Sequence, residues 1–341
     1  EAFEARIGNT DAMAYHAERI VVGVGPCGEA AGMRWAEMAF AAGSRFAPPV
    51  LAGFFMRGVA VPGDLKRAVE LLLPSAEAGD ETSIRQCITL YGFPDAPGRR
   101  PLVEAYRWDL RLLDLYPDDP AQLNYCGNAC FTIALRGRRA RNLPSFGSRK
   151  MPCIAGWISA TLADHLGALR LDSWRYDWFR KALGHYRRAA ERHDPQALTN
   201  LGDFAFLGIG GEPRDEAEAF RRYKRGMDAG DWYAYVNLGV MLCKGWGCEA
   251  DLARGWELLR KAQAAGLAMA EIMLWFCTVG HDDEIKVPYP DVSRFAQAYN
   301  EFYYPAANRG LDQFFKGVAR FIVYVLALIS VVFAVLRYLV F

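Results

Sequence analysis

The chain has 341 residues, enough for two or three ordinary domains or for one long repeat array. Hydrophobic residues make up 52% of it, charged residues make up 23%, and the formal net charge is +1. This composition argues against an intrinsically disordered chain, and the balanced charge predicts no general attraction to nucleic acid.

The first motif along the chain is Gly23-Val-Gly25-Pro-Cys-Gly28, which matches the G-x-G-x-x-G pattern of dinucleotide-binding proteins. Such a protein needs an acidic residue about 20 positions further on to bind the ribose. Residues 44–56 contain no carboxylate, and no strand–helix alternation follows. Phosphate-loop, zinc-protease and nucleophile-elbow motifs are also absent, and the five histidines are scattered. We therefore expect no catalytic residue, no cofactor and no metal.

The glycines instead belong to an internal repeat, which is cleanest in residues 234–266. There Leu238-Gly239 precedes a Gly245-Trp-Gly247 turn, Asp251 follows the turn, and Ala265-Gly266 closes the unit. Residues 47–79 and 197–230 have the same order of features, and seven units with a period of about 36 residues can be placed. Each unit predicts a helix, a glycine turn, an aspartate cap, a second helix and a closing Ala-Gly.

The spacing A-x3-L-G…G-x-G…D-x3-A…A-G resembles the Sel1-like repeat, a relative of the tetratricopeptide repeat. The resemblance implies an all-α fold, a right-handed α-solenoid of stacked helix hairpins over residues 1–311 that acts as a non-catalytic scaffold or adaptor. The predicted units cover residues 12–46, 47–81, 82–120, 121–194, 197–233, 234–269 and 270–311. The 82–120 unit departs furthest, because "YGFPDAPGRRP" replaces the glycine turn, and we expect an irregular hairpin there.

The fourth unit carries a basic insertion, predicted at residues 136–177. Its cationic residues are Arg136, Arg138, Arg139, Arg141, Arg149 and Lys150. They are candidates for contact with an acidic partner or with anionic lipid. The alternative is a solvated loop, or one paired with acidic faces of the same solenoid. Trp174 and Trp178, in or beside the insertion, and Trp246, inside a glycine turn, are further candidates for partner contact.

The eight cysteines form no C-x-x-C pair, so we expect buried free thiols rather than a metal or redox motif.

The C-terminal residues 318–341 predict a transmembrane helix. Sixteen residues without charge lie between Arg320 and Arg337, and both arginines can extend towards the membrane surfaces. Tyr324 and Tyr338 are expected at the two interfaces. The basic residues before the span predict that the N-terminal body lies on the cytoplasmic or matrix side.

Together these features favour a membrane-anchored scaffold, an accessory subunit of a large respiratory or ATP synthase complex in the mitochondrial inner membrane, with the body in the matrix. The expected partners are other protein subunits, the lipid bilayer and possible anionic lipid, with no nucleic acid. The alternatives are an adaptor of the kind used in ER-associated degradation, with the ER as its location, and an assembly factor of the bacterial envelope at the bacterial inner membrane.

Overall fold

The computed structural model describes residues 10–21, 28–93, 95–98, 100–136 and 173–278, and over these ranges the chain forms thirteen α-helices and no strand. Contacts divide the chain into two compact units, residues 1–234 and 235–341, with the boundary inside α13. In chain order, the helices are α2 (Thr10–Val21), α3 (Glu29–Ala41), α4 (Ala47–Arg57), α5 (Leu65–Glu77), α6 (Glu81–Tyr91), α7 (Pro101–Leu115), α8 (Pro120–Arg136), α10 (Ser173–Glu191), α11 (Pro195–Leu207), α12 (Glu216–Asp228), α13 (Trp232–Lys244), α14 (Leu252–Ala264) and α15 (Ala268–Thr278).

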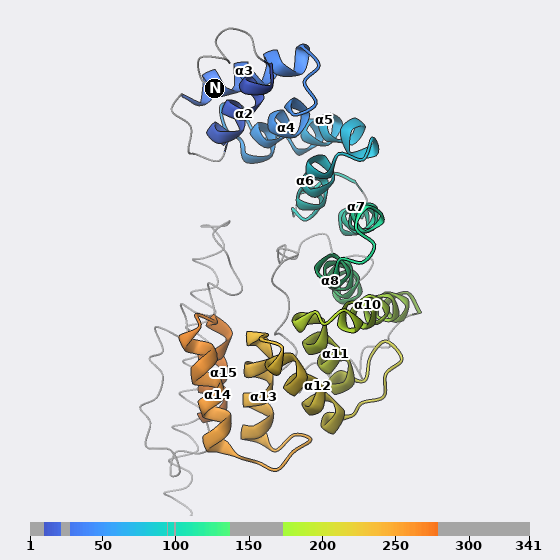
Figure 1. Ribbon diagram of the computed structural model, residues 1–341, viewed down its shortest axis with the longest axis vertical. Helices are drawn as coiled ribbons and strands as arrows, with labels where there is room; N and C mark the ends of the chain where they lie inside the picture. The colour runs from blue at the N-terminus through green and yellow to red at the C-terminus, as the bar shows by residue number, and fades with distance from the viewer. Residues whose placement is uncertain (1–9, 22–27, 94, 99, 137–172, 279–341) are drawn as a thin grey trace, which may run out of the picture. The chain divides into compact units, whose positions relative to one another are not determined.

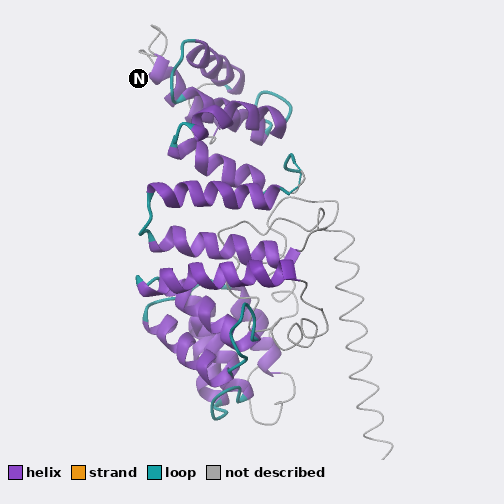
Figure 2. Ribbon diagram, turned by 90° about the vertical axis from the view of Figure 1, so that its right-hand side faces the viewer, coloured by secondary structure: helices purple, strands orange, loops and turns teal. Residues whose placement is uncertain are grey.

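The helices pack as stacked hairpins, which confirms the all-α repeat fold predicted from the sequence. Within the first unit, α2 packs on α3, α4 on α5, α6 on α7, α8 on α10 and α11 on α12 (Figures 1 and 2). Both α6 and α7 are regular helices, so the departure of this hairpin from the repeat is confined to the turn between them. In the second unit, α14 packs on α15.

The turn inside each hairpin depends on a glycine and an aspartate, as the repeat predicts. Gly58, Gly208 and Gly245 follow the first helix with φ between 66° and 67°, a left-handed conformation that ends a helix without the steric cost of a Cβ. The aspartate after the turn caps the second helix: the Asp215 carboxylate accepts a hydrogen bond from the backbone N–H of Glu218 at 2.8 Å. The same geometry recurs at Asp64 and Asp251.

Two non-glycine residues occupy left-handed positions that other repeats give to glycine. Ala60, with φ of 61°, aligns with Gly210 and Gly247, the second glycines of their turns. His193, with φ of 62°, aligns with the closing glycines of other units, such as Gly230 at 94°. Both residues therefore have a strained backbone, because a Cβ atom is crowded by the carbonyl oxygen in the left-handed conformation.

Paired helices approach closely where the first helix has a glycine and the second a tyrosine or leucine. A Cβ added at Gly202 would lie 2.5 Å from the Tyr223 ring. The Tyr223 hydroxyl donates a 2.6 Å hydrogen bond to Asp203, the residue after that glycine. In the α8–α10 hairpin the Tyr186 hydroxyl donates to Asn128 in the same way, at 2.8 Å.

In the α13–α14 hairpin, apolar residues replace both the tyrosine and the polar residue that follows the helix glycine. Leu259 takes the tyrosine's place against Gly239, and the residue after the glycine is the buried Val240. The buried hydroxyl and its buried acceptor thus occur together or are replaced together, which leaves neither polar group without a partner.

Six cysteines lie in the described ranges, and all six are free thiols. Five are buried and Cys248 is partly buried, which confirms the prediction for this part of the chain. None of the described helices has the length and apolar run needed to cross a membrane. The predicted anchor at 318–341, with Arg320, Tyr324, Arg337 and Tyr338, lies outside the described residues, as does the Gly23–Gly25 motif.

Candidate interaction surface

The structure describes only part of the predicted contact set. Arg136 is the last residue of α8. The other five basic residues, Arg138, Arg139, Arg141, Arg149 and Lys150, lie outside the described residues. Trp246 follows α13 and is half-buried in its turn, where its backbone N–H donates to the Met241 carbonyl at 3.0 Å.

Trp178 is mainly a packing residue and offers little surface to a partner. Its side chain is 8% exposed, and its ring meets the Tyr106 ring of α7 edge-to-face at 5.3 Å. The Trp174 ring contacts it at 6.1 Å, and the Lys181 ammonium lies 4.4 Å from its ring centre. The indole of Trp178 therefore joins α10 to α7, while Trp174 remains half-buried nearer the surface.

A partly buried hydrogen-bonded pair lies beside this aromatic contact. The Tyr106 hydroxyl and the Nε2 atom of His185 are 3.0 Å apart. Burial, with a smaller contribution from Arg188 and Lys181, lowers the pKa of His185 to about 4. Burial raises the pKa of the neighbouring Cys130 thiol to about 12. A neutral imidazole next to a protonated thiol gives no activated nucleophile, so this cluster is structural.

Asp109, on the same helix as Tyr106, is a buried carboxyl group that faces α8. The Gln122 side-chain amide donates to its Oδ1 at 3.2 Å and to its backbone carbonyl at 3.1 Å. Burial raises the pKa of Asp109 to about 7, and the Gln122 hydrogen bond opposes that rise only in part. No guanidinium or ammonium contact to this carboxyl group accompanies the hydrogen bond in the described residues.

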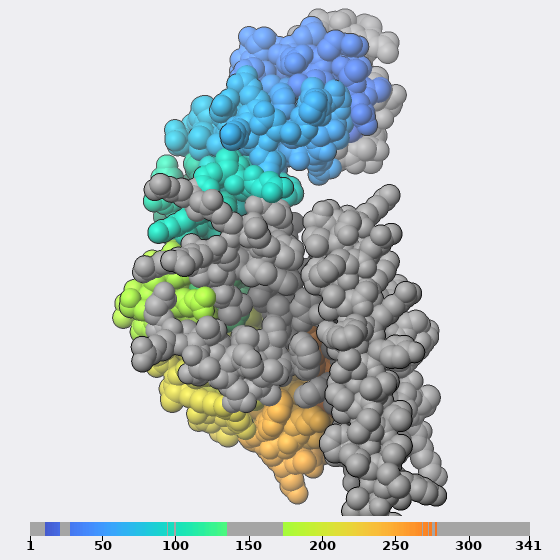
Figure 3. All heavy atoms as spheres, turned by 180° about the vertical axis from the view of Figure 1, so that it is seen from behind, coloured from blue at the N-terminus to red at the C-terminus, as the bar shows by residue number. Residues whose placement is uncertain are grey.

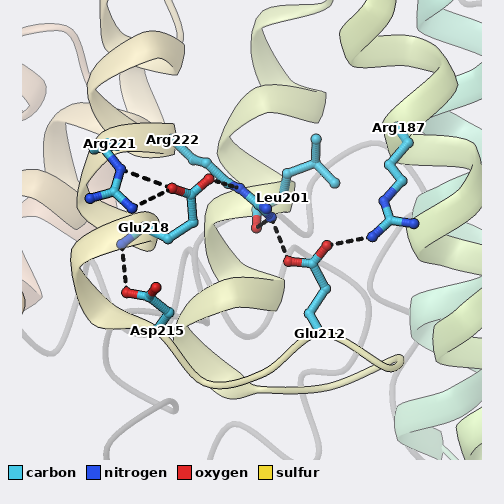
Figure 4. Close-up of polar contacts among 7 residues, drawn as sticks. All are labelled: Arg187, Leu201, Glu212, Asp215, Glu218, Arg221 and Arg222. Atoms are coloured by element: carbon cyan, nitrogen blue, oxygen red, sulfur yellow. Dashed lines mark hydrogen bonds and ion pairs between the residues drawn. The ribbon is translucent and has the colours of Figure 1, made fainter.

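An ion-pair network fixes the turn between α11 and α12 against α10 (Figure 4). Glu212, whose side chain is 7% exposed, accepts from Arg187 of α10 at 2.6 Å and from Arg222 of α12 at 2.8 Å. Arg222 also donates to the Leu201 carbonyl at 2.9 Å and to Glu218 at 2.8 Å. The hydrogen bond from Arg222 is the largest cause that lowers the pKa of Glu218.

The outer side of α10 carries exposed aromatic and cationic side chains, and part of this helix is visible at the surface in light green in Figure 3. We call it the α10 face, and it consists of Trp174, Tyr176, Arg180, Lys181 and Arg187. Tyr176 is 40% exposed, and the three cationic residues are exposed. Arg187 is already ion-paired with Glu212, so Arg180 and Lys181 are the cations that no carboxylate in the described residues neutralises. Guanidinium and ammonium groups next to aromatic rings suit a carboxylate-bearing protein surface.

The sequence analysis missed four members of this face, Tyr176, Arg180, Lys181 and Arg187. The signal was present, because aromatic and basic residues recur at helical spacing in "SWRYDWFRKALGHYRR". In the described ranges no group of His, Cys, Asp and Glu residues is arranged to hold a metal ion.

Comparison with known proteins identifies the repeat. The family model described as Sel1 repeat matches residues 51–80, 176–194, 195–231 and 232–267. A Sel1 repeat protein from Oxalobacter formigenes is 21% identical over 93% of this chain and 89% of its own, with a TM-score of 0.44. The c5321 protective antigen of uropathogenic Escherichia coli, which displays an SLR fold, is 18% identical over 90% of this chain and 67% of its own, with a TM-score of 0.37. No curated protein matches the chain.

The matched segments coincide with the hairpins built above: 51–80 with most of α4 and α5, 195–231 with α11 and α12, and 232–267 with α13 and α14. The segment 176–194 covers most of α10, the second helix of the hairpin interrupted by the insertion. Four segments of the chain therefore match the Sel1 repeat, and the stacked hairpins of the described residues are consistent with that repeat.

Proposed function

We propose that this chain is a non-catalytic scaffold that holds other proteins together, as an accessory subunit of a large respiratory or ATP synthase complex in a membrane. The observation that carries the proposal is the α10 face, an exposed set of cationic and aromatic side chains on a rigid, buried-core hairpin. The opposite side of α10 packs into the core, where Phe179 and Tyr186 are almost completely buried, so the α10 face is held in a fixed position. A preorganised surface of this kind loses little entropy when it binds a partner.

Charge reversal on the α10 face tests the scaffold function. The double variant Arg180→Glu/Lys181→Glu places two negative charges where the proposed acidic partner docks. We expect it to reduce recovery of co-purifying proteins from native membranes by about tenfold or more, since like charges across an interface cost several kcal/mol.

The matched control is Lys224→Glu/Arg225→Glu on α12, an adjacent pair of exposed basic residues in the same compact unit. This variant should keep the wild-type set of partners. Equal recovery from the α10 variant and from the control would overturn the assignment of the α10 face. A wild-type chain that co-purifies with no protein would overturn the scaffold function itself.

The membrane part of the proposal rests on the uncharged run within residues 318–341. Native purification from mitochondrial inner membranes, with mass spectrometry of the proteins that co-migrate, should recover subunits of one large complex. Protease treatment of sealed inner-membrane vesicles of known sidedness should cleave the body only when the matrix face is accessible. A body protected in the lumen of ER vesicles would instead favour the adaptor of ER-associated degradation.

A further inference from the structure

Helix α3 presents a group of exposed apolar side chains. Met38 is 54% exposed and Phe40 is 42% exposed. Ala30 and Ala41, near the two ends of the helix, are exposed as well. Exposed apolar side chains that are grouped, rather than scattered singly, mark a contact with another molecule.

The opposite side of α3 is packed into the first compact unit, so the exposed side is held in place. Met33 is 7% exposed, and Ala36 and Ala39 are completely buried. The helix packs on both α2 and α4. A partner that binds the exposed side of α3 therefore meets a preformed surface, which keeps the entropic cost of binding low.

Two opposite charges lie among these apolar residues without an ion pair. Arg34 and Glu37 are exposed, and neither forms an ion pair with a described residue. Arg67 and Glu70 of α5 have the same order and the same spacing, and their charged groups are 2.8 Å apart. Arg34 and Glu37 thus keep a donor and an acceptor for charge-assisted contact with another molecule.

The positions of these residues make the exposed side of α3 complementary to itself. At about 100° per residue, positions 30, 34, 37 and 41 occupy one arc of about 60° on the helix. Residues 34 and 37 have the same midpoint along the helix axis as residues 30 and 41, and that midpoint falls between residues 35 and 36. A twofold axis through this point pairs Arg34 of one copy with Glu37 of a second copy, and Ala30 with Ala41.

We propose that α3 is a self-association surface, through which two copies of this chain pair antiparallel about a twofold axis. The pairing forms two ion pairs between Arg34 of one copy and Glu37 of the other. A second copy supplies both charges in the order that α3 requires, whereas a purely acidic or purely basic partner would neutralise only one of them.

The apolar residues complete the contact. Ala30 and Ala41 are small, so the two helices can approach closely at both ends. Met38 lies on one side of the central arc and Phe40 on the other, so the two copies of each line the edges of the contact and shield the ion pairs from water. One helix of 13 residues buries a small area, and we therefore expect a dissociation constant of about 1–100 μM.

Charge exchange tests the pairing in the purified full chain, kept in a mild non-ionic detergent because of the predicted membrane segment. Sedimentation velocity over about 1–300 μM gives the dissociation constant of the dimer. Arg34→Glu sets glutamate against glutamate at the contact, and Glu37→Arg sets arginine against arginine. Each variant should dissociate about tenfold or more readily than the wild type, since like charges then face each other.

Two restorations follow from the twofold pairing. The double variant Arg34→Glu/Glu37→Arg exchanges both charges, and its dissociation constant should return to within about threefold of the wild-type value. An equimolar mixture of the two single variants should also form dimers, because every glutamate then faces an arginine. Restoration by mixing shows in addition that both single variants are folded.

Arg67→Glu on α5 is the matched control, because Arg67 is exposed and already paired with Glu70. It should leave the dissociation constant unchanged. A wild-type chain that stays monomeric at the highest concentration, or a dimer that neither single variant weakens, would overturn the proposal. Weakened single variants that neither mixing nor the double exchange restores would also overturn it, since Arg34 and Glu37 would then not face each other.

Discussion

Replacing Asp109 by asparagine should stabilise the chain at neutral pH, although it removes a charged group from a hydrogen bond. The native pKa of this carboxyl group is about 7, compared with 3.8 for the ordinary group. Between these values the folded chain binds a proton that the unfolded chain has lost, so the free energy of unfolding falls as pH rises. The full difference of about three pKa units corresponds to about 4 kcal/mol above pH 7.

The asparagine keeps an oxygen that can accept the Gln122 hydrogen bond, seen in the wild type at 3.2 Å. Its new N–H donors need acceptors, which lowers the gain by about 1–2 kcal/mol. We therefore expect Asp109→Asn to raise the free energy of unfolding by about 2 kcal/mol at pH 8 and to leave it nearly unchanged near pH 5, where the gain and the penalty cancel. Below about pH 4, where the wild-type group is protonated in both states, the variant should be less stable by about 1–2 kcal/mol.

The assay is urea denaturation of wild type and variant, followed by circular dichroism, at several values between pH 4.5 and 8. The difference between the two chains is the informative quantity, because His185 titrates in the opposite sense. Its pKa of about 4 makes stability rise with pH up to about 6.5, and that contribution cancels in the difference. Asp114→Asn, an exposed change on the same helix, should show no such dependence. A gain that is absent at pH 8, or equal at all pH values, would refute the assigned protonation of Asp109.

Four further substitutions test the backbone and packing arguments, each by the shift in urea midpoint. Ala60→Gly and His193→Gly should each stabilise the chain by about 0.5–1 kcal/mol, because both remove a Cβ from a left-handed position; a loss at either position would contradict the strain. Gly202→Ala should destabilise by about 1–3 kcal/mol, since the new Cβ would lie 2.5 Å from the Tyr223 ring. The same substitution at Gly184, mid-helix on α10 with no atom within 4 Å of the added Cβ, should stabilise by about 0.5–1 kcal/mol. If Gly202→Ala and Gly184→Ala shift the urea midpoint in the same direction, the room available for the added Cβ does not determine the effect of these substitutions on stability.

The repeat fold could be predicted from the sequence because its determinants are local. The left-handed glycine at Gly208 and the cap at Asp215 are set by residues within a few positions of each other, so their spacing alone predicts two helices and a turn. The recurrence of that spacing then predicts stacking, because one hairpin cannot bury its apolar side.

The surface and the buried polar groups depend on contacts that span long stretches of sequence. Trp178 meets Tyr106 of α7, 72 positions earlier, and the hydrogen-bonded partner of Tyr106 is His185, 79 positions away. The repeat pattern of residues 181–193 is visible in the sequence, but it does not show that Trp178 and His185 meet Tyr106 of α7. The buried state of Asp109 depends on the same pairing of neighbouring hairpins, which no local pattern reports.

The coupling of a tyrosine to the polar residue after a helix glycine limits how such an array can be rearranged. A chimera that joins α11 to a second helix of the α14 type would set a leucine against Gly202 and remove the hydroxyl that donates to Asp203. The reverse chimera would bury a tyrosine hydroxyl opposite Val240. Gene duplication or engineering that exchanges whole hairpins avoids both faults, whereas exchange of half-hairpins creates one of them. The smallest interchangeable module of this chain is therefore the hairpin, and not the helix.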